Sequence, residues 1–272
     1  KIDNAGDFNN DGYDDVIVTA YGSTNSAGIV YVLFGTSSGW TTDLDVDNTP
    51  FTSGSTGFRI LGVSDSYGLG KSAAGVGDVN GDGIDDIMFG SDKGTAYVIY
   101  GYVPGTYSDV LLSAFTSGST GFKMIGTSTS NSFGWASCNA GDFNNDGIND
   151  VIVGELYGDP SGRSNAGIAY VILGSNSGTY TDIDINTNIH AQIALQINGE
   201  TAGDTLGFAV GHAGDTNSDG IDDVLIGAPY AYSSVGRCYV VYGSASYSLS
   251  IIEVSSLTAT STGFTIFGTG GS

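Results

Sequence analysis

The string Asp-x-Asn-x-Asp-Gly-x-x-Asp occurs four times in this 272-residue chain, starting at Asp7, Asp78, Asp142 and Asp215. Successive copies start 71, 64 and 73 residues apart. Self-similarity at a long, nearly constant period indicates a repeat architecture, in which each unit buries its apolar faces against its neighbours. We therefore expect one domain over residues 1–272, built from units at about 1–62, 63–126, 127–199 and 200–268.

Each unit is expected to contain four β-strands. A short segment precedes the Asp-rich loop, and an apolar run such as Val16-Ile17-Val18 follows it. Two further runs bounded by glycine come next, over 28–35 and 57–62 in the first unit. Short runs rich in Val, Ile, Tyr and Phe between glycines are typical of strands. The strand that follows the loop and the strand after it (16–18 and 28–35 in the first unit) are nearly continuous in apolar residues, so both of their faces should be covered.

Four-stranded antiparallel sheets repeated around an axis, each packed on the next, explain this pattern. The expected fold class is all-β: a β-propeller of four-stranded antiparallel blades, with four repeats visible. A linear β-solenoid is the alternative, but its repeats are usually much shorter. Four blades can close a ring, and we favour a closed four-bladed ring. Membership of a larger ring and pairing with another copy of the chain stay open.

The four units differ in the lengths of the connections between their strands. Nearly all of this variation falls between the second and third strands, which are 9, 4, 13 and 9 residues apart (19 to 28, 90 to 94, 154 to 167, 227 to 236). In an up-and-down sheet this connection lies on the face opposite the Asp-rich loops. Variable loops on a constant scaffold are the usual place for binding specificity.

The Asp-rich loops have the composition of calcium sites. Positions 1, 3, 5 and 9 offer side-chain oxygens, position 6 is a glycine at a sharp turn, and position 7 is expected to offer a backbone carbonyl. The predicted ligands are Asp7, Asn9, Asp11, Tyr13 and Asp15; Asp78, Asn80, Asp82, Ile84 and Asp86; Asp142, Asn144, Asp146, Ile148 and Asp150; and Asp215, Asn217, Asp219, Ile221 and Asp223. The sequence thus predicts four Ca²⁺ sites.

Three other interpretations of the loops are less favoured. An EF-hand needs a bidentate Glu at position 12 and flanking helices, but position 12 is Val18, Phe89, Val153 or Ile226. Magnesium seldom uses an all-protein cage of this kind. The third interpretation is that the loops are polar hairpin turns that bind no ion. It is less favoured because all four loops keep every ligand position.

The chain resembles the FG-GAP repeats of integrin α-subunit propellers and their relatives in microbial surface proteins. The residues that carry this resemblance are Phe133-Gly134, Leu69-Gly70 and Leu206-Gly207 before the loops, and Gly227-Ala228-Pro229 after a second strand. The calcium loop is the most specific part of the match. The Gly-Ala-Pro element is present in the fourth unit alone, and the first unit starts at Lys1 without its Phe-Gly pair. Integrin propellers have seven blades, whereas four units are visible here.

Charge and composition exclude several classes of function. The chain has 29 acidic against 7 basic residues, a formal charge of −22, so neither nucleic acid nor an anionic membrane surface is an expected partner. No apolar run approaches the roughly 20 residues of a membrane span. Two cysteines, Cys138 and Cys238, are too few for a disulfide scaffold and could pair or stay as buried thiols.

No enzyme is predicted. The two histidines, His190 and His212, show no catalytic pattern, and Gly35-Thr-Ser37-Ser-Gly39 resembles a nucleophile elbow but enters no helix. Twelve of the 29 acidic residues are committed to the loops as predicted ligands. Closed all-oxygen calcium loops would also leave no open position for a substrate.

Two binding functions remain. The first is an extracellular or cell-surface adhesion or assembly module that binds a protein partner, or copies of itself, through the variable loops. The second is a lectin-like module that stacks glycans on tyrosines. Because Tyr and Arg are favoured at interfaces, the candidate contacts are Tyr21, Tyr157, Arg163, Tyr230, Tyr232 and Arg237. Extracellular calcium modules bind with dissociation constants of about 10⁻⁴–10⁻³ M, which supports secretion or surface display.

Overall fold

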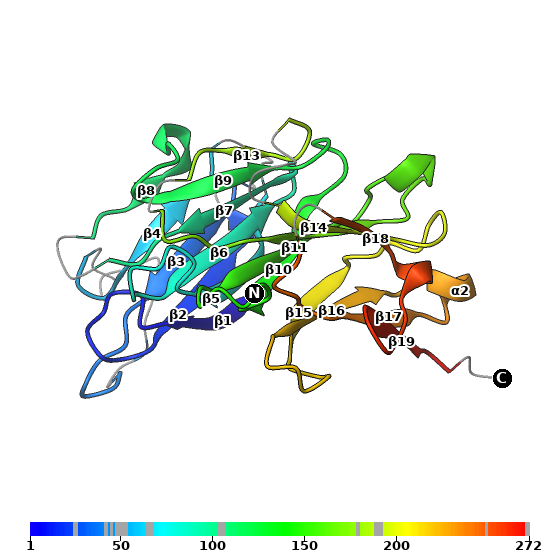
Figure 1. Ribbon diagram of the computed structural model, residues 1–272. Coiled ribbons are helices and arrows are strands. Elements are labelled where there is room, and N and C mark those ends of the chain that lie inside the picture. Colours follow the sequence, from blue (N-terminus) through cyan, green and yellow to red (C-terminus); the bar gives the residue numbers. More distant parts are fainter. Residues whose placement is uncertain are drawn as a thin grey trace.

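Four antiparallel sheets follow one another along the chain in the computed structural model, which describes residues 1–23, 27–40, 43, 46, 54–63, 68–102, 107–177, 180–187, 193–247 and 250–269 (Figure 1). In each sheet, here called a blade, four strands A to D pair in chain order. The first blade contains β1 (Ile2–Gly6), β2 (Asp15–Ala20), β3 (Ile29–Leu33) and β4 (Gly57–Leu61); the second β5 (Leu69–Gly77), β6 (Asp86–Ser91), β7 (Thr95–Ile99) and β9 (Gly121–Ile125); the third β10 (Phe133–Gly141), β11 (Asp150–Glu155), β12 (Ile168–Ile172) and β14 (Ile193–Asn198); the fourth β15 (Ala209–Gly214), β16 (Asp223–Ala228), β17 (Arg237–Val241) and β19 (Gly263–Phe267). The all-β fold and the four strands per unit agree with the prediction.

The first three blades each gain a fifth strand that the sequence analysis did not predict. β8 (Val110–Leu111) pairs in parallel with β4, β13 (Ile183–Asp184) with β9, and β18 (Ser250–Glu253) with β14. Each added strand comes from the C–D connection of the next unit. Every unit after the first therefore reaches back and covers the outer edge of the blade before it.

In the part of the chain that the structure describes, short helical turns lie in the connections between strands. The described turns are η1 (Leu112–Ala114), η2 (Pro160–Gly162), α2 (Ala231–Ser234) and η3 (Val254–Ser256). Within the described ranges, no helix has the length and apolar character needed to cross a bilayer.

The A strands lie around a common centre. A hollow of about 400 Å³ is lined by residues at the starts of all four A strands: Lys1, Lys71–Ala73, Trp135–Ser137 and Phe208–Val210. Blades that share an inner channel and follow each other around it form a β-propeller. This confirms the expected architecture.

Three hydrophobic cores hold the blades together, one at each junction between consecutive blades. The first includes Phe58 and Phe89, the second Tyr170 and Met88, and the third Leu195 and Tyr239. The described residues form no fourth core joining β15–β19 to the first blade, and the two sheets do not pack broadly on one another. Figure 1 shows β16, β17 and β19 at one side of the molecule with the C-terminus at its outer margin. The favoured closed ring of four is therefore not observed, and the blades form an open arc.

Burial follows from this arrangement. All residues of β6, β7, β11 and β12 are buried, as expected for strands covered on both faces. The terminal blades differ, because β1, β15 and β19 each carry exposed residues. Only the middle blades have neighbours on both sides, so the expected double coverage holds fully for them alone.

Candidate metal centre

The four Asp-rich loops connect strand A to strand B at the same place in every blade. The glycine before each loop sits at a break in the strand register, where its φ is positive: 67° at Gly6, 69° at Gly77, 71° at Gly141 and 67° at Gly214. The glycine at loop position 6 is also left-handed, with φ of 87–91° in all four copies. Side chains rarely adopt this conformation, so the two glycines fix the loop geometry.

The aspartate at loop position 1 accepts hydrogen bonds from two backbone N–H groups of its own loop. In the first loop, Oδ1 of Asp7 accepts the N–H of Asp11 at 2.8 Å, and Oδ2 accepts the N–H of Gly12 at 2.9 Å. The same two bonds recur on Asp78, Asp142 and Asp215. The same hydrogen-bonded turn therefore recurs in all four loops.

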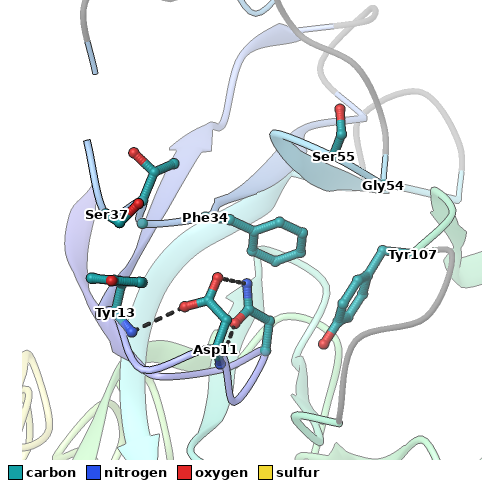
Figure 2. Close-up of a pocket in the computed structure, with 10 residues that line it drawn as sticks. Asp11, Tyr13, Phe34, Ser37, Gly54, Ser55 and Tyr107 are labelled. Carbon is teal, nitrogen blue, oxygen red and sulfur yellow. Dashed lines mark hydrogen bonds between the residues drawn. The ribbon is translucent and has the colours of Figure 1, made fainter. Parts of the chain in front are cut away.

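The side chains at loop positions 3 and 5 are hydrogen-bonded to each other. The Oδ1 of Asn9 accepts the N–H of Asp11 at 2.9 Å, and the Oδ1 of Asp11 accepts the N–H of Tyr13 at 3.0 Å. The Nδ2 of Asn9 donates to the other oxygen of Asp11 at 3.0 Å, as the dashed lines in Figure 2 show. The three remaining loops repeat this pattern.

The aspartate at position 9 is fully buried in every loop. One oxygen of Asp86 accepts the N–H of Gly101 at 2.8 Å, and the other accepts the N–H of Val79 at 2.9 Å. In the first loop, Oδ1 of Asp15 accepts from Gly35, while the buried Oδ2 lacks a hydrogen-bond partner. Burial raises the pKa of Asp15 to about 7 and that of Asp86 to about 8, although backbone hydrogen bonds oppose the shift and loop aspartates add to it. Asp150 shows the same effect, with its pKa raised by burial to about 7.

These residues suit a hard divalent cation. Every loop offers carboxylate and amide oxygens, and a buried carboxylate with a raised pKa is one whose charge lacks a compensating partner. Within the described residues, however, no three acidic, His or Cys side chains converge closely enough to hold a metal ion. The carboxylates instead bond to backbone N–H groups of their own loops. The structure thus provides the oxygen atoms that could bind a cation and the turn of each loop.

A hollow of about 430 Å³ lies beside the first loop (Figure 2). Asp11 and Tyr13 form one wall, Ser37 and Gly54 come from the C–D connection, and Tyr107 comes from the next unit. The A–B and C–D connections therefore share one end of the blades, as the up-and-down order of the strands predicted. Ser37, from the nucleophile-elbow-like string, lies in this hollow.

The structure brings together three of the six predicted ligand-binding residues. Tyr230, Tyr232 and Arg237 line a cavity of about 670 Å³ with Glu200 and Asp204. Because 200–204 belongs to a D–A connection and 230–234 to a B–C loop, these connections share the face opposite the Asp-rich loops. The guanidinium of Arg237 pairs with Glu200 and lies 5.1 Å from the Tyr232 ring centroid.

The other three predicted contacts do not join this cavity. The hydroxyl of Tyr21 donates to Asp92, and Lys71 lies over its ring at 4.4 Å. Arg163 pairs with Glu253, and Tyr157 is exposed on the third blade. These interactions within the chain hold Tyr21 and Arg163.

The remaining singled-out residues have ordinary environments. Nε2 of His212 lies 3.0 Å from Asp222, whereas His190 falls outside the described residues. Cys138 and Cys238 are free thiols rather than a disulfide, and burial raises the pKa of both.

Sequence reasoning missed the residue at loop position 8. Asp85 reaches the preceding blade, where its Oδ2 accepts the N–H of Asp7 at 2.9 Å, and Asp222 does the same to Asp142. The signal was present in the sequence, because position 8 is Asp in three loops and Asn149 in the other. It was masked by the adjacent Asp at position 9.

Comparison with protein families now adds independent support. The family model described as the FG-GAP repeat matches residues 4–33 and 207–247, and the model described as an FG-GAP-like repeat matches 78–153. Together these segments cover more than half of the chain and include all four loops. The chain is an FG-GAP repeat protein.

Relatives of this FG-GAP protein include several integrin α chains. It is 29% identical to integrin alpha pat-2 of Caenorhabditis briggsae over 177 residues, covering 57% of this chain and 13% of that protein. It is 32% identical to mouse integrin alpha-8 over 171 residues, covering 61% and 14%. It is also 29% identical to a phosphatidylinositol-glycan-specific phospholipase D of Dictyostelium discoideum over 172 residues, covering 57% and 17%. The match therefore spans less than a fifth of the length of each of these relatives.

Proposed function

We propose that this chain is an extracellular or cell-surface FG-GAP propeller that binds structural calcium and serves as a protein-binding module in adhesion or surface assembly. The observation that carries the proposal is the fourfold loop, with a preformed turn and a fully buried position 9 carboxylate in every copy. The names of the integrin α relatives support the adhesion part. We propose a binding module rather than an enzyme, because the described site residues form no catalytic constellation.

Calcium would resolve the electrostatic problem of the loops. It takes six to eight oxygen ligands, and each loop offers four such side chains and a position 7 carbonyl. In the first loop, the buried Oδ2 of Asp15 lacks a hydrogen-bond partner and is available to an ion. Four bound Ca²⁺ ions would also change the formal charge from −22 to −14. At the weak affinities of extracellular calcium modules, the sites would fill outside the cell.

The lectin-like function is the second candidate, and one observation favours it. Tyr230 and Tyr232 are exposed beside Glu200 and Asp204 in one cavity. Exposed rings can stack on sugars while carboxylates accept hydrogen bonds from hydroxyl groups. A glycan array with Tyr230→Ala and Tyr157→Ala variants separates the two functions: a sugar signal lost in Tyr230→Ala and kept in Tyr157→Ala would favour the lectin.

The test of the calcium proposal is thermal unfolding with Ca²⁺ and with a chelator. Ca²⁺ at ten to a hundred times its Kd should stabilise the fold by about 1.4–2.7 kcal/mol per filled site, because the unfolded chain lacks the assembled loops. Calorimetric titration should give four sites, and Asp146→Asn should leave three. Asp3→Asn, an exposed aspartate outside the loops, is the matched control and should leave four. A Tm that chelation does not change would refute structural calcium.

A further inference from the structure

The four Asp-rich loops are connected in series, because each loop from the second onward contacts the loop of the preceding blade. The position 8 residue makes the first of these contacts. Asp85 of the second loop accepts the N–H of Asp7, the first predicted ligand of the preceding loop, through Oδ2 at 2.9 Å. Asp222 of the fourth loop accepts the N–H of Asp142 in the same way, also at 2.9 Å. Both carboxylates are half-buried at junctions between blades.

The glycine before each loop makes room for the position 8 side chain of the next blade. A Cβ on Gly6 would lie 2.1 Å from Oδ2 of Asp85. A Cβ on Gly141 would lie 2.2 Å from Oδ2 of Asp222. This glycine therefore serves the junction as well as the turn, because any side chain at its position would overlap the carboxylate.

A second connection runs through the backbone from position 9 of the later loop. The carboxylate of Asp86 accepts the N–H of Gly101 at 2.8 Å. The next residue, Tyr102, donates its N–H to the carbonyl of Phe8, at position 2 of the preceding loop, at 3.2 Å. The other two junctions repeat both bonds, from Asp150 through Gly174 and Ser175 to Val79, and from Asp223 through Gly243 and Ser244 to Phe143. Each later loop is thus linked to the earlier one through one of its own predicted ligands.

These contacts give calcium binding in one loop a way to affect the next. Asp85 stands between two predicted ligands of its own loop, the carbonyl of Ile84 and the carboxylate of Asp86. Ligation at both would hold the backbone on either side of Asp85 and fix the carboxylate that bonds to Asp7. Asp7 in turn holds two backbone N–H groups of the first loop and is itself a predicted ligand. The first loop would then lose less conformational entropy when it binds its own ion.

We propose that the position 8 carboxylates of Asp85 and Asp222 are positioning residues that couple calcium binding in their own loops to calcium binding in the loop of the preceding blade. The inference rests on the proposed structural calcium and adds its regulation: the sites fill cooperatively in two pairs, the first loop with the second and the third with the fourth. Such coupling is reciprocal, so each member of a pair raises the affinity of the other. A carboxylate shared between two loops also reduces the repulsion between their cations.

The middle junction explains the division into pairs. Its position 8 residue is Asn149, which carries no charge and donates its backbone N–H to the carbonyl of Asp78 at 3.1 Å. A Cβ on Gly77 would lie 2.7 Å from the Asn149 side chain, so this side chain lies against the glycine as the two carboxylates do. Without a charged hydrogen bond, which is the stronger kind, coupling between the second and third loops is expected to be weaker.

A calcium titration followed by NMR at each loop tests the coupling. The amide of the position 6 glycine reports on its own loop, because its N–H bonds to the position 1 carboxylate; these residues are Gly12, Gly83, Gly147 and Gly220. Asp82→Asn removes a predicted ligand from the second loop and should raise the Kd of the first loop by about fivefold or more. Asp219→Asn, in the fourth loop, should raise the Kd of the third loop and leave that of the first unchanged.

The direction of this effect separates it from long-range electrostatics. An empty second loop leaves its remaining carboxylates uncompensated, and their charge alone would attract a cation to the first loop more strongly. Coupling through Asp85 predicts the opposite, a weaker first site when the second is empty.

Asp85→Ala separates the position 8 contact from the loop that carries it. It should raise the Kd of the first loop about five- to tenfold and cancel most of the further effect of Asp82→Asn. Asp14→Ala is the matched control, because Asp14 holds position 8 of the first loop itself and its loss removes the same charge. The Kd of the first loop should then change by less than about twofold. In chelator, the Asp7 amide should exchange about tenfold faster in Asp85→Ala, a readout that needs no calcium.

The possible failures of the coupling and of the calcium proposal are distinguishable. Four ions that bind independently in the original chain and in Asp82→Asn would overturn the coupling and leave structural calcium intact. Equal increases of the first-loop Kd in Asp85→Ala and Asp14→Ala would assign the effect to lost charge and would also overturn it. Glycine signals that do not respond to Ca²⁺ in the original chain would overturn both proposals. If Asp85→Ala does not fold, Asp222→Ala makes the same test on the third loop.

Discussion

At the scale of single residues, Glu155 is the clearest departure from the repeat. It ends β11 at the position held by Ala20, Ser91 and Ala228 in the other blades, and it is fully buried. Its Oε1 accepts the N–H of Thr127 at 2.8 Å and the hydroxyl of the same residue, and Oε2 accepts the hydroxyl of Tyr170. Burial nevertheless raises the pKa of Glu155, because three donors do not replace full hydration.

A raised folded-state pKa has a defined effect on stability. The neutral form of Glu155 is favoured in the folded protein. Its contribution to the free energy of unfolding is therefore full below the ordinary pKa of about 4.5, and it is lost as pH rises through the folded-state pKa. Glu155→Gln removes this titration. With Ca²⁺ saturating, we expect its unfolding free energy, relative to that of the original chain, to increase from pH 4 to pH 8. Urea unfolding at several pH values measures the difference, and a pH-independent difference would contradict the prediction.

At the scale of elements, the reach-back connection stabilises each junction more than its short strands suggest. β13 spans two residues, but the connection that contains it also buries Tyr180 on Phe122 and Ile183 in the second core. Such a segment contributes mainly apolar surface, since two residues of strand provide few hydrogen bonds.

Truncating one of these rings tests that view. Tyr180→Ala should lower the unfolding free energy by about 3–5 kcal/mol, as expected for removing a large buried aromatic side chain. Tyr157→Ala removes the same side chain from an exposed site and should change stability by under about 0.5 kcal/mol. Chemical denaturation of both variants provides the measurement. Similar losses of unfolding free energy in the two variants would show that the C–D connection does not stabilise the junction between blades.

At the scale of the whole molecule, four blades joined by three cores form a nearly one-dimensional array. Each blade contacts its immediate neighbours, so stability should decrease from the middle blades toward the ends. Open ends have fewer buried contacts and should open locally at lower free energy.

Hydrogen exchange resolves this gradient. Amides of β1, β15 and β19 should exchange faster than those of β6, β7, β11 and β12. Equal protection of β19 and β11 would indicate that the fourth blade is covered, as in a ring closed by the single chain.

The sequence alone determined the units, the strands within them and the position of each Asp-rich loop. These features depend on local chemistry: apolar runs define strands, and left-handed glycines such as Gly12 and Gly83 define the turns. The sharing of loops between two faces also followed, since alternating strands place alternate connections at opposite ends. The role of the loop residues as calcium ligands stays a prediction.

The tertiary structure decided how the units meet. Whether four blades close into a ring depends on the rotation between neighbouring sheets, added over three junctions. The sequence of a single repeat does not determine that total rotation. The fifth strands were equally hidden, because Val110–Leu111 and Ile183–Asp184 are too short to be recognised until β4 and β9 offer their edges. Likewise, Tyr230 and Glu200 are thirty residues apart in the sequence and share a cavity only because two connections end on one face. Local sequence patterns therefore define the strands and turns of each blade, whereas long-range packing decides how the blades are arranged.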